Sequence, residues 1–380
     1  MLILENGNVY APDPLGRVPI LIAGGRIEKI GGFDVSTVAD ALECDVVDAS
    51  GWIIAPGLID PHAHLTGGSG EQGFATQTPE MHASELWKSG ITTVVGTLGT
   101  DTTTKTLPPL LARVKALREE GLGAFMWTGG YDGRPLTSSM RDDVILIEEI
   151  IGFGEIAIAD RRSLHYTALE LARMATDCYV AGTLTGKAGV LHLHVGDGER
   201  RLAVLRKVLD AFEVRPSTLY PTHVERNEAL MEEAIELTRR GVTIDLDVYE
   251  QDLGRWMQFY LERGGDLSRI TASSDAAIKS PHMLFEQIRA LVREGVLPLQ
   301  QALAVATLNT ARVLKLHDRG KLAPGMRADF IALDAESLDL LCVVCNGELV
   351  LRDGRLVRRE KFRAQSNRII NLTGDQSDRH

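Results

Sequence analysis

The middle of this 380-residue chain alternates between short apolar runs and longer amphipathic stretches. The apolar runs are rich in β-branched residues and occur eight times, at residues 57–60, 92–96, 123–127, 155–158, 189–195, 218–222, 242–247 and 269–273. Helix-like stretches separate them, for example at 108–120, 142–151, 167–181, 200–212 and 227–240. Strands that alternate with helices predict an α/β fold with a parallel sheet, and eight strands can close into a TIM-like (β/α)8 barrel.

A doubly wound open sheet is the competing α/β architecture. Such a sheet typically carries a glycine-rich, phosphate-binding turn directly after its first strand. Here the first strand leads instead into the sequence His62-Ala63-His64. The barrel is therefore the favoured fold.

The two ends of the chain differ from the middle. Both contain short β-type segments divided by turn signals, which are Gly24-Gly25 and Gly31-Gly32 near the start and Asn346-Gly347 and Asp353-Gly354 near the end. A terminal strand is most stable when it pairs into an existing sheet, so we expect the two ends to fold together. The predicted domains are a catalytic barrel of residues 55–317 and a small β module of residues 1–54 plus 318–380.

Composition excludes several classes of protein. The chain carries 41 Lys and Arg against 52 Asp and Glu, and its net charge of −11 disfavours binding to the phosphate backbone of nucleic acids. No apolar run reaches the roughly 18–20 residues that a transmembrane helix needs. The start lacks the pattern of a secretory signal, and four cysteines are too few for a disulfide framework. We expect a cytoplasmic enzyme that binds neither nucleic acid nor membrane.

Metal-binding residue types follow several of the predicted strands. His62 and His64 are two positions apart, so both imidazoles can face one side of a strand and bind one ion. His194 ends the fifth strand, His223 follows the sixth and Asp275 follows the eighth. The carboxyl ends of barrel strands meet at one rim, where active sites lie. Imidazole and carboxylate ligands on that rim predict a divalent metal, with zinc the best fit.

Two further polar residues lie near strand ends. His192 shares a strand face with His194 but lies deeper, so we expect it in the core or behind the ligands. Asp247 ends the seventh strand, and we expect it to contact a metal-binding residue rather than the metal itself.

Several motifs resemble those of the amidohydrolase superfamily. They are the run APGLIDPHAH at 55–64 together with His194, His223 and Ser274-Asp275. A closer resemblance, to isoaspartyl (β-aspartyl) dipeptidases, rests on GGSGE at 67–71, VVGTLGT at 94–100, TGGY at 128–131, DRRS at 160–163 and PTHVERN at 221–227. The segment GMRADF at 325–330 resembles the point where such proteins return to a small β-sandwich built from both termini. The similarity covers most of the chain.

The resemblance implies a centre of two zinc ions. His62, His64 and Asp275 would hold the more buried ion, His194 and His223 would hold the other, and a hydroxide would bridge them. Two divalent ions about 3.5–4 Å apart repel each other unless anions lie between them. In the resembling dipeptidases one such anion is a carboxylated lysine at the end of the fourth strand. The matching position here is Glu155.

Glu155 departs from the family pattern and leaves two alternatives open. In the first, its carboxylate bridges the two ions directly, although it reaches three bonds less far than a carboxylated lysine. In the second, the site holds one ion or is inactive. A carboxylate at the required strand end favours the first alternative. No lysine lies nearby, since Lys187 belongs to the loop before the fifth strand.

The resemblance also implies a set of substrate-binding residues. Glu71 would bind the α-ammonium group, and Thr100 would support substrate binding. Arg162 and Arg226 would pair with substrate carboxylates, because a guanidinium can bind a carboxylate through two parallel hydrogen bonds. Tyr131 would polarise the scissile carbonyl and stabilise the oxyanion.

The loop after Asp275 departs from the resembling dipeptidases as well. In those proteins a serine lies four residues beyond the metal-binding aspartate, whereas Lys279 occupies that position here and Ser280 follows it. Because this loop lines the substrate, Lys279 and Ser280 join the candidate binding residues and the preference for the leaving residue stays open.

The expected activity is hydrolysis of a small β-aspartyl dipeptide by a zinc-bridged hydroxide. Asp275 would act as general base and then as general acid, with Tyr131 and Glu71 as the other catalytic candidates. The resemblance also suggests a homo-oligomer. The alternatives are a cyclic-amide hydrolase of the dihydroorotase or hydantoinase type, an N-acyl-amino-acid deacylase, and a non-catalytic scaffold relative.

Overall fold

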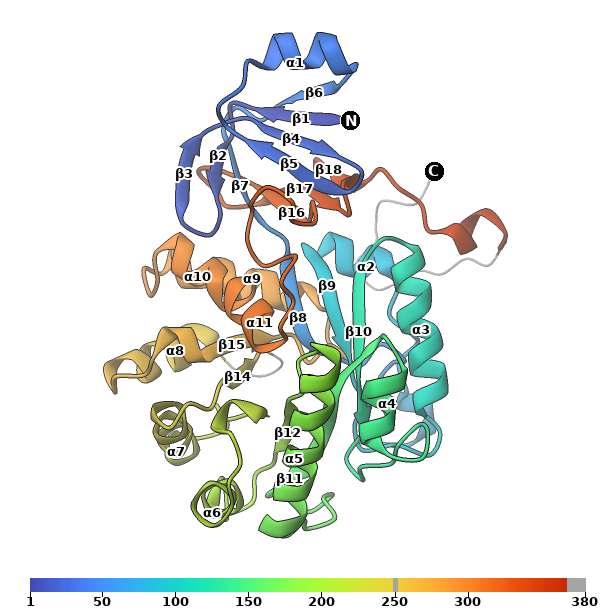
Figure 1. Ribbon diagram of the computed structural model, residues 1–380, viewed down its shortest axis with the longest axis vertical. Helices are drawn as coiled ribbons and strands as arrows, with labels where there is room; N and C mark the ends of the chain where they lie inside the picture. Colours follow the sequence, from blue (N-terminus) through green and yellow to red (C-terminus); the bar gives the residue numbers. More distant parts are fainter. Residues whose placement is uncertain (249–251, 368–380) are drawn as a thin grey trace.

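A computed structural model describes residues 1–248 and 252–367 of the chain (Figure 1). Eight parallel strands and the helices around them form the lower part of the molecule in this view, and a β-rich part lies above them. The barrel strands are β8 (Leu58–Ala63), β9 (Ile91–Gly96), β10 (Gly123–Gly129), β11 (Ile150–Ile158), β12 (Leu191–Val195), β13 (Leu219–Thr222), β14 (Ile244–Asp247) and β15 (Ile270–Ser273). The predicted barrel fold is thereby confirmed.

Two seams join the six-stranded sheet β8–β13 to the two-stranded sheet β14–β15. Between β13 and β14, the Thr222 hydroxyl donates a hydrogen bond of 2.9 Å to the Asp245 carboxylate. Between β15 and β8, the backbone N–H of Asp275 donates to the carbonyl of His62 at 3.1 Å, and the N–H of His64 donates to the carbonyl of Ala276 at 2.9 Å. The second seam therefore fixes three of the predicted metal ligands relative to one another.

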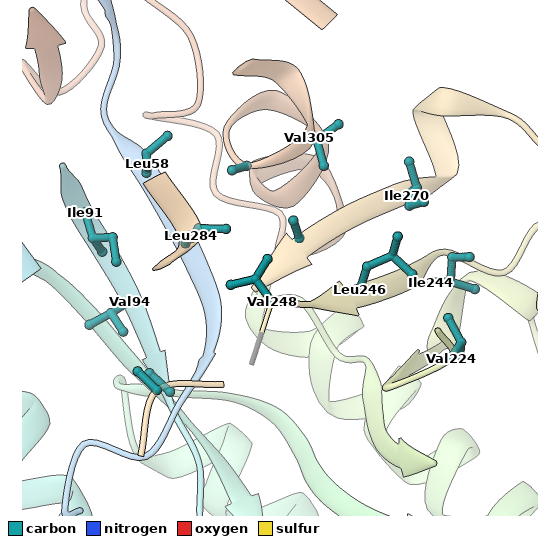
Figure 2. Close-up of a cluster of buried hydrophobic side chains, with 14 of the residues drawn as sticks. Leu58, Ile91, Val94, Val224, Ile244, Leu246, Val248, Ile270, Leu284 and Val305 are labelled. Carbon is teal, nitrogen blue, oxygen red and sulfur yellow. The ribbon is translucent and has the colours of Figure 1, made fainter. Parts of the chain in front are cut away.

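Helices surround this ring of strands. Those that follow the successive strands are α2 (Ala83–Lys88), α3 (Leu107–Glu119), α4 (Met140–Leu146), α5 (Ala168–Thr185), α6 (Ala203–Ala211), α7 (Glu228–Arg239), α8 (Leu253–Glu262) and α9 (His282–Arg293), followed by α10 (Leu299–Val305) and α11 (Leu308–Val313). Figure 2 shows how the apolar side chains of β8, β9, β14 and β15 gather with residues of the outer helices, such as Leu284 of α9 and Val305 of α10. Because both faces of each strand are covered, nearly every barrel strand residue is buried, as is usual in parallel sheets.

Strands from both ends of the chain build the upper part. One sheet has the order β5-β4-β1-β6, from Arg26–Ile30, Ile20–Ala23, Leu2–Glu5 and Asp45–Asp48. The other has the order β19-β18-β17-β16-β7-β2-β3, from Arg355–Leu356, Glu348–Arg352, Leu340–Cys345, Phe330–Asp334, Trp52–Pro56, Asn8–Tyr10 and Pro14–Arg17. A shared apolar core that includes Ile20, Ile27, Phe330 and Val344 packs the two sheets into the expected β-sandwich.

One local expectation is wrong, and one helix was not predicted. The predicted helix 142–151 ends at Leu146, and the chain enters β11 at Ile150, where Met126 of β10 pairs with it. An apolar run of this length fits a buried strand as well as a helix, and pairing between β10 and β11 decides for the strand. The N-terminal end also contains a helix, α1 (Val35–Leu42), whose first turn is capped by Asp34 accepting from Thr37 N–H at 2.8 Å.

Candidate metal centre

Six side chains from five strand ends converge at the carboxyl-end rim of the barrel. His62 lies on β8 and Glu155 on β11, both fully buried, and His194 lies on β12. His64, His223 and Asp275 lie in the turns that directly follow β8, β13 and β15. Subsets of three among these six place one ligand atom each within 4.8 Å of one another. The structure therefore brings together all six residues proposed from the sequence as metal ligands.

Glu155 stands at the centre of the group. Its Oε2 atom lies 3.1 Å from Nδ1 of His194 and 3.6 Å from Nε2 of both His62 and His223. Its Oε1 atom lies 3.8 Å from Nε2 of His64. Burial alone would raise the pKa of Glu155, but the charges of His62 and His194 outweigh it and hold the pKa well below the usual range. The Glu155 carboxylate thus lies within 3.8 Å of a ring nitrogen of each of the four histidines.

Asp275 lies beside His62 and His64, the two histidines at the end of β8. Its Oδ1 atom lies 3.2 Å from Nε2 of His62 and 3.1 Å from Nε2 of His64. Burial works against ionisation of Asp275, but its close contacts with the imidazoles of His62 and His64 prevail and lower its pKa below the usual range. Asp275 is therefore a carboxylate at neutral pH.

The backbone places two of these ligands in an uncommon conformation. His223 has φ of 62° and Asp275 has φ of 46°, both in the left-handed region that few residues other than glycine adopt. Such conformations often persist where a side chain must be aimed for function.

A chain of hydrogen bonds leaves one imidazole atom of His62 available to a metal. Nδ1 of His192 lies 3.0 Å from the Tyr220 carbonyl, which can only accept, so His192 donates from Nδ1 and accepts at Nε2. Nδ1 of His62 lies 2.8 Å from that Nε2 and donates to it. Nε2 of His62 then points into the cluster, where it is buried and has no hydrogen-bond partner among the described residues.

The environment of His62 favours a cation at this position. Burial lowers the pKa of His62, but the carboxylates of Glu155 and Asp275 raise it by more, well above the usual value. A site that attracts a proton between imidazoles and carboxylates attracts a divalent cation for the same reason, and the two compete. The unpaired Nε2 atom of His62 and the imidazole and carboxylate groups around it therefore fit a divalent metal that takes nitrogen and oxygen ligands.

His223 has a carboxylate behind it. Its Nδ1 lies 2.6 Å from Oδ2 of Asp247, so Nε2 faces the cluster, and Asp247 takes the supporting position expected for it. Glu225 lies close to this pair, and neither of its buried oxygens has a hydrogen-bond partner among the described residues. Burial and the neighbouring Asp247 raise the pKa of Glu225 well above its usual range.

Tyr131, Asp160 and Arg162 surround His194. The Tyr131 hydroxyl lies 2.8 Å from Nδ1 of His194, and Oδ2 of Asp160 lies 3.1 Å from its Nε2. Arg162 donates to the Asp160 carboxylate through Nε at 2.9 Å and Nη2 at 2.7 Å, and its guanidinium lies 5.4 Å from the centre of the Tyr131 ring. The contact between Asp160 and His194 is not predicted from the sequence, although Asp160 opens the DRRS motif on which the resemblance rests.

The remaining candidate residues lie farther out. Glu71 pairs with Arg162 at 2.8 Å, and the Nε atom of Arg226 donates to the carbonyl of Val195 at 2.8 Å. Thr100 follows Gly99, whose missing side chain leaves room for the ring of His64. Lys279 and Ser280 line a groove of about 1120 Å³ that His64 also lines. The structure thus clusters Glu71 with Arg162 beside the metal ligands and leaves Lys279 and Ser280 exposed on the groove wall.

The similarity to known proteins covers the residues of this centre. The model of the amidohydrolase family matches residues 53–258 and 260–350, which include all six candidate ligands. The chain belongs to the amidohydrolase family. Within the described residues of this family member, no helix has the length and apolar character needed to cross a membrane.

Two solved structures of β-aspartyl dipeptidase from Fervidobacterium islandicum AW-1 are similar to this amidohydrolase. The complex with a β-Asp-Leu dipeptide is 37% identical in sequence, with a TM-score of 0.89 over 94% of this chain and 98% of that one. The structure described without a dipeptide is 39% identical, with the same TM-score over 94% of this chain and 99% of that one. D-hydantoinase, 18% identical with a TM-score of 0.65, shares the fold.

Curated relatives of this amidohydrolase carry another name. Adenine deaminase 3 from Rhizobium meliloti is 25% identical over 94% of this chain and 58% of its own length. Adenine deaminase 2 from Rhizobium etli is 26% identical over 90% of this chain and 56% of its own length. The chain therefore spans a little over half the length of these relatives.

Proposed function

We propose that this amidohydrolase hydrolyses β-aspartyl dipeptides at a centre of two zinc ions. The observation that carries the proposal is the position of Glu71 and Arg162 beside the metal ligands, with Arg162 held by Asp160 and next to Tyr131. A β-aspartyl dipeptide carries one ammonium and two carboxylate groups, so it requires an acid and cationic donors close to the scissile bond. The similarity in both sequence and fold to two dipeptidase structures supports the same substrate class.

The ligand set divides into two halves that would each hold one ion. His62, His64 and Asp275 form one half, and His194 and His223 form the other. Glu155 lies within 3.8 Å of all four histidines, which is the position of a carboxylate shared between two ions. This supports the first of the two alternatives left open by the sequence, in which Glu155 replaces a carboxylated lysine.

Bound zinc would polarise the scissile carbonyl and lower the pKa of a coordinated water. Asp275 is held as a carboxylate at the rim, where it can accept a proton from the attacking water and pass it to the leaving amine. Burial, together with the charge of Glu155, raises the pKa of Tyr131 well above its usual value. Tyr131 therefore stays a protonated phenol that can donate a hydrogen bond to the developing oxyanion.

Two carboxylates set the orientation of Arg162. Asp160 binds its Nε and Nη2 atoms, and Glu71 binds Nη1 at 2.8 and 3.0 Å. A substrate carboxylate that approached Arg162 would compete with Glu71, which the substrate ammonium could then bind. Glu71 is about half exposed, so this exchange requires little desolvation. Such paired charges are unnecessary for a neutral purine.

The deciding experiment compares the two named activities in the zinc-loaded protein. We expect release of leucine from β-Asp-Leu, no cleavage of the α-linked isomer, and no release of ammonia from adenine. Added bicarbonate should make no difference, because no lysine needs to be carboxylated. Deamination of adenine without cleavage of β-Asp-Leu would refute the proposal, and bicarbonate-dependent cleavage would refute the role of Glu155.

A further inference from the structure

A second polar cavity lies at the opposite end of the barrel from the metal centre. It has a volume of about 410 Å³ and opens where β12, β13, β14 and β15 begin. Its walls come from α5, from the short turns that precede these four strands, and from α11. Residues 218, 243 and 269 line it, whereas His223, Asp247 and Asp275 lie at the far ends of the same strands. The cavity is therefore separate from the site of the proposed hydrolysis.

Four cationic side chains line this cavity, and its lining contains no carboxylate. They are Arg215, Arg269, Arg312 and Lys315. This is unusual for a chain whose net charge is −11. Cations gathered around one cavity repel each other, so an anion bound between them would stabilise the arrangement.

Three of these cations lack a carboxylate partner within the described residues. Within residues 1–248 and 252–367, no carboxylate lies within ion-pair distance of Arg215, Arg312 or Lys315. Arg269 donates from Nη1 to the carbonyl of Gly241 at 2.9 Å, which leaves its other N–H groups available. Asp266 lies outside the lining and accepts a hydrogen bond from the backbone N–H of Ser268 at 2.9 Å. Hydrogen bonds from Ser268, and to a smaller extent the charges of Arg269 and Arg312, lower the pKa of Asp266.

Other lining residues give the cavity a defined shape. The guanidinium of Arg215 lies 4.9 Å from the centre of the Tyr179 ring, so its planar group is held against an aromatic face. The buried Asn309 donates from Nδ2 to the carbonyls of Leu267 and Ile270 at 2.7 and 3.0 Å. These contacts tie α11 to the turn that carries Arg269, so the backbone that bears these two groups of cations is fixed, while the side chains of Arg215, Arg312 and Lys315 are exposed to solvent.

The chemistry of the lining indicates the ligand. Guanidinium groups bind phosphate oxygens through paired, charge-assisted hydrogen bonds, and an ammonium group adds a point charge. The volume exceeds that of a bare ion and lies in the range of small-molecule sites. Tyr179 and Val190 supply an apolar wall for an organic group. We propose that this cavity binds a small phosphate-bearing molecule, at a site distinct from the metal centre.

Calorimetric titration with phenyl phosphate, at constant ionic strength, tests this proposal. We expect Arg312→Gln and Lys315→Gln each to weaken binding about tenfold or more, since each removes a charge-assisted hydrogen bond. The matched control is Lys207→Gln on α6, which removes the same charge from an exposed position outside the cavity and should bind like the wild type. A thermal shift in the same four proteins gives a second readout and shows that each variant is folded.

Four outcomes would overturn the proposal. Absence of binding to the wild type would show that the cavity takes no phosphate ester. Equal binding by all four proteins would place the ligand elsewhere, as would an equal loss in the Lys207→Gln control. Malonate binding as tightly as phenyl phosphate would show that the site does not select phosphate. None of these outcomes depends on β-aspartyl dipeptide hydrolysis, so the test stands apart from the proposed function.

Discussion

Nδ1 of His62 lies 2.8 Å from Nε2 of His192, and Nδ1 of His192 lies 3.0 Å from the carbonyl of Tyr220. Because a carbonyl only accepts, this relay fixes both tautomers and turns the lone pair of His62 Nε2 toward the metal ligands. His192 is fully buried, and burial holds its pKa well below the usual value. His192 therefore orients His62 and is not itself one of the candidate metal ligands.

Loss of this relay should weaken metal binding. We expect His192→Phe to reduce zinc affinity about 10- to 100-fold, the usual effect of removing a partner of a metal-binding histidine. His192→Gln keeps an acceptor for His62 and should lose much less. Competition with a chromophoric chelator measures both affinities. Equal affinity in the wild type and the phenylalanine variant would show that the relay does not set the tautomer of His62.

Glu155 should decide how many ions bind. Glu155→Gln removes the charge between the two halves of the site, so we expect the zinc content to fall to one ion per chain or less. Glu155→Lys restores the longer side chain of the resembling dipeptidases and should regain activity only when bicarbonate is added. Metal analysis and a dipeptide assay with and without bicarbonate measure these effects. Two ions retained by the glutamine variant would contradict the shared-carboxylate arrangement.

The sequence predicted most of the fold because two kinds of signal were strong. Strand–helix alternation led to the barrel, and the ligands were found because the carboxyl end of each parallel strand lies on one rim, as with His194 on β12. The contact between Asp160 and His194 was not predictable, because it depends on how the chain turns after β11, where Ala159 adopts φ of 49°. The end of α4 was also missed, since apolar runs do not distinguish a buried strand from a helix.

Asp275 offers a test of the proton-transfer step. Asp275→Asn preserves the shape of the side chain, and asparagine tolerates the backbone φ of 46° better than most residues. We expect kcat to fall by about 10²- to 10⁴-fold, the usual contribution of a general acid–base group. Zinc content should largely persist, because His62 and His64 keep their positions. Full turnover in this variant would exclude Asp275 from proton transfer.

Glu71 tests the proposed substrate class. Arg162 stays bound to Asp160 when Glu71 is replaced, so Glu71→Gln should leave the metal centre intact. We expect the KM for β-Asp-Leu to rise about 10- to 100-fold, as when a hydrogen bond between charged groups is lost. The matched control is Glu236→Gln, an exposed acid on α7 that lies outside the metal centre and the groove. A similar KM in both variants and the wild type would mean that Glu71 does not bind the substrate ammonium.

Tyr131 allows a test based on pH. Burial and the charge of Glu155 raise the pKa of its phenol well above 10, so Tyr131 stays protonated across the range in which the enzyme is assayed. Any fall in kcat/KM on the alkaline side up to about pH 10 therefore arises from other groups. Tyr131→Phe should lower kcat/KM about 10²- to 10³-fold, the effect of losing one oxyanion donor, without changing the alkaline limb of the profile. A limb that disappears in the phenylalanine variant would show instead that Tyr131 itself titrates, and that its phenol is not the fixed donor we propose.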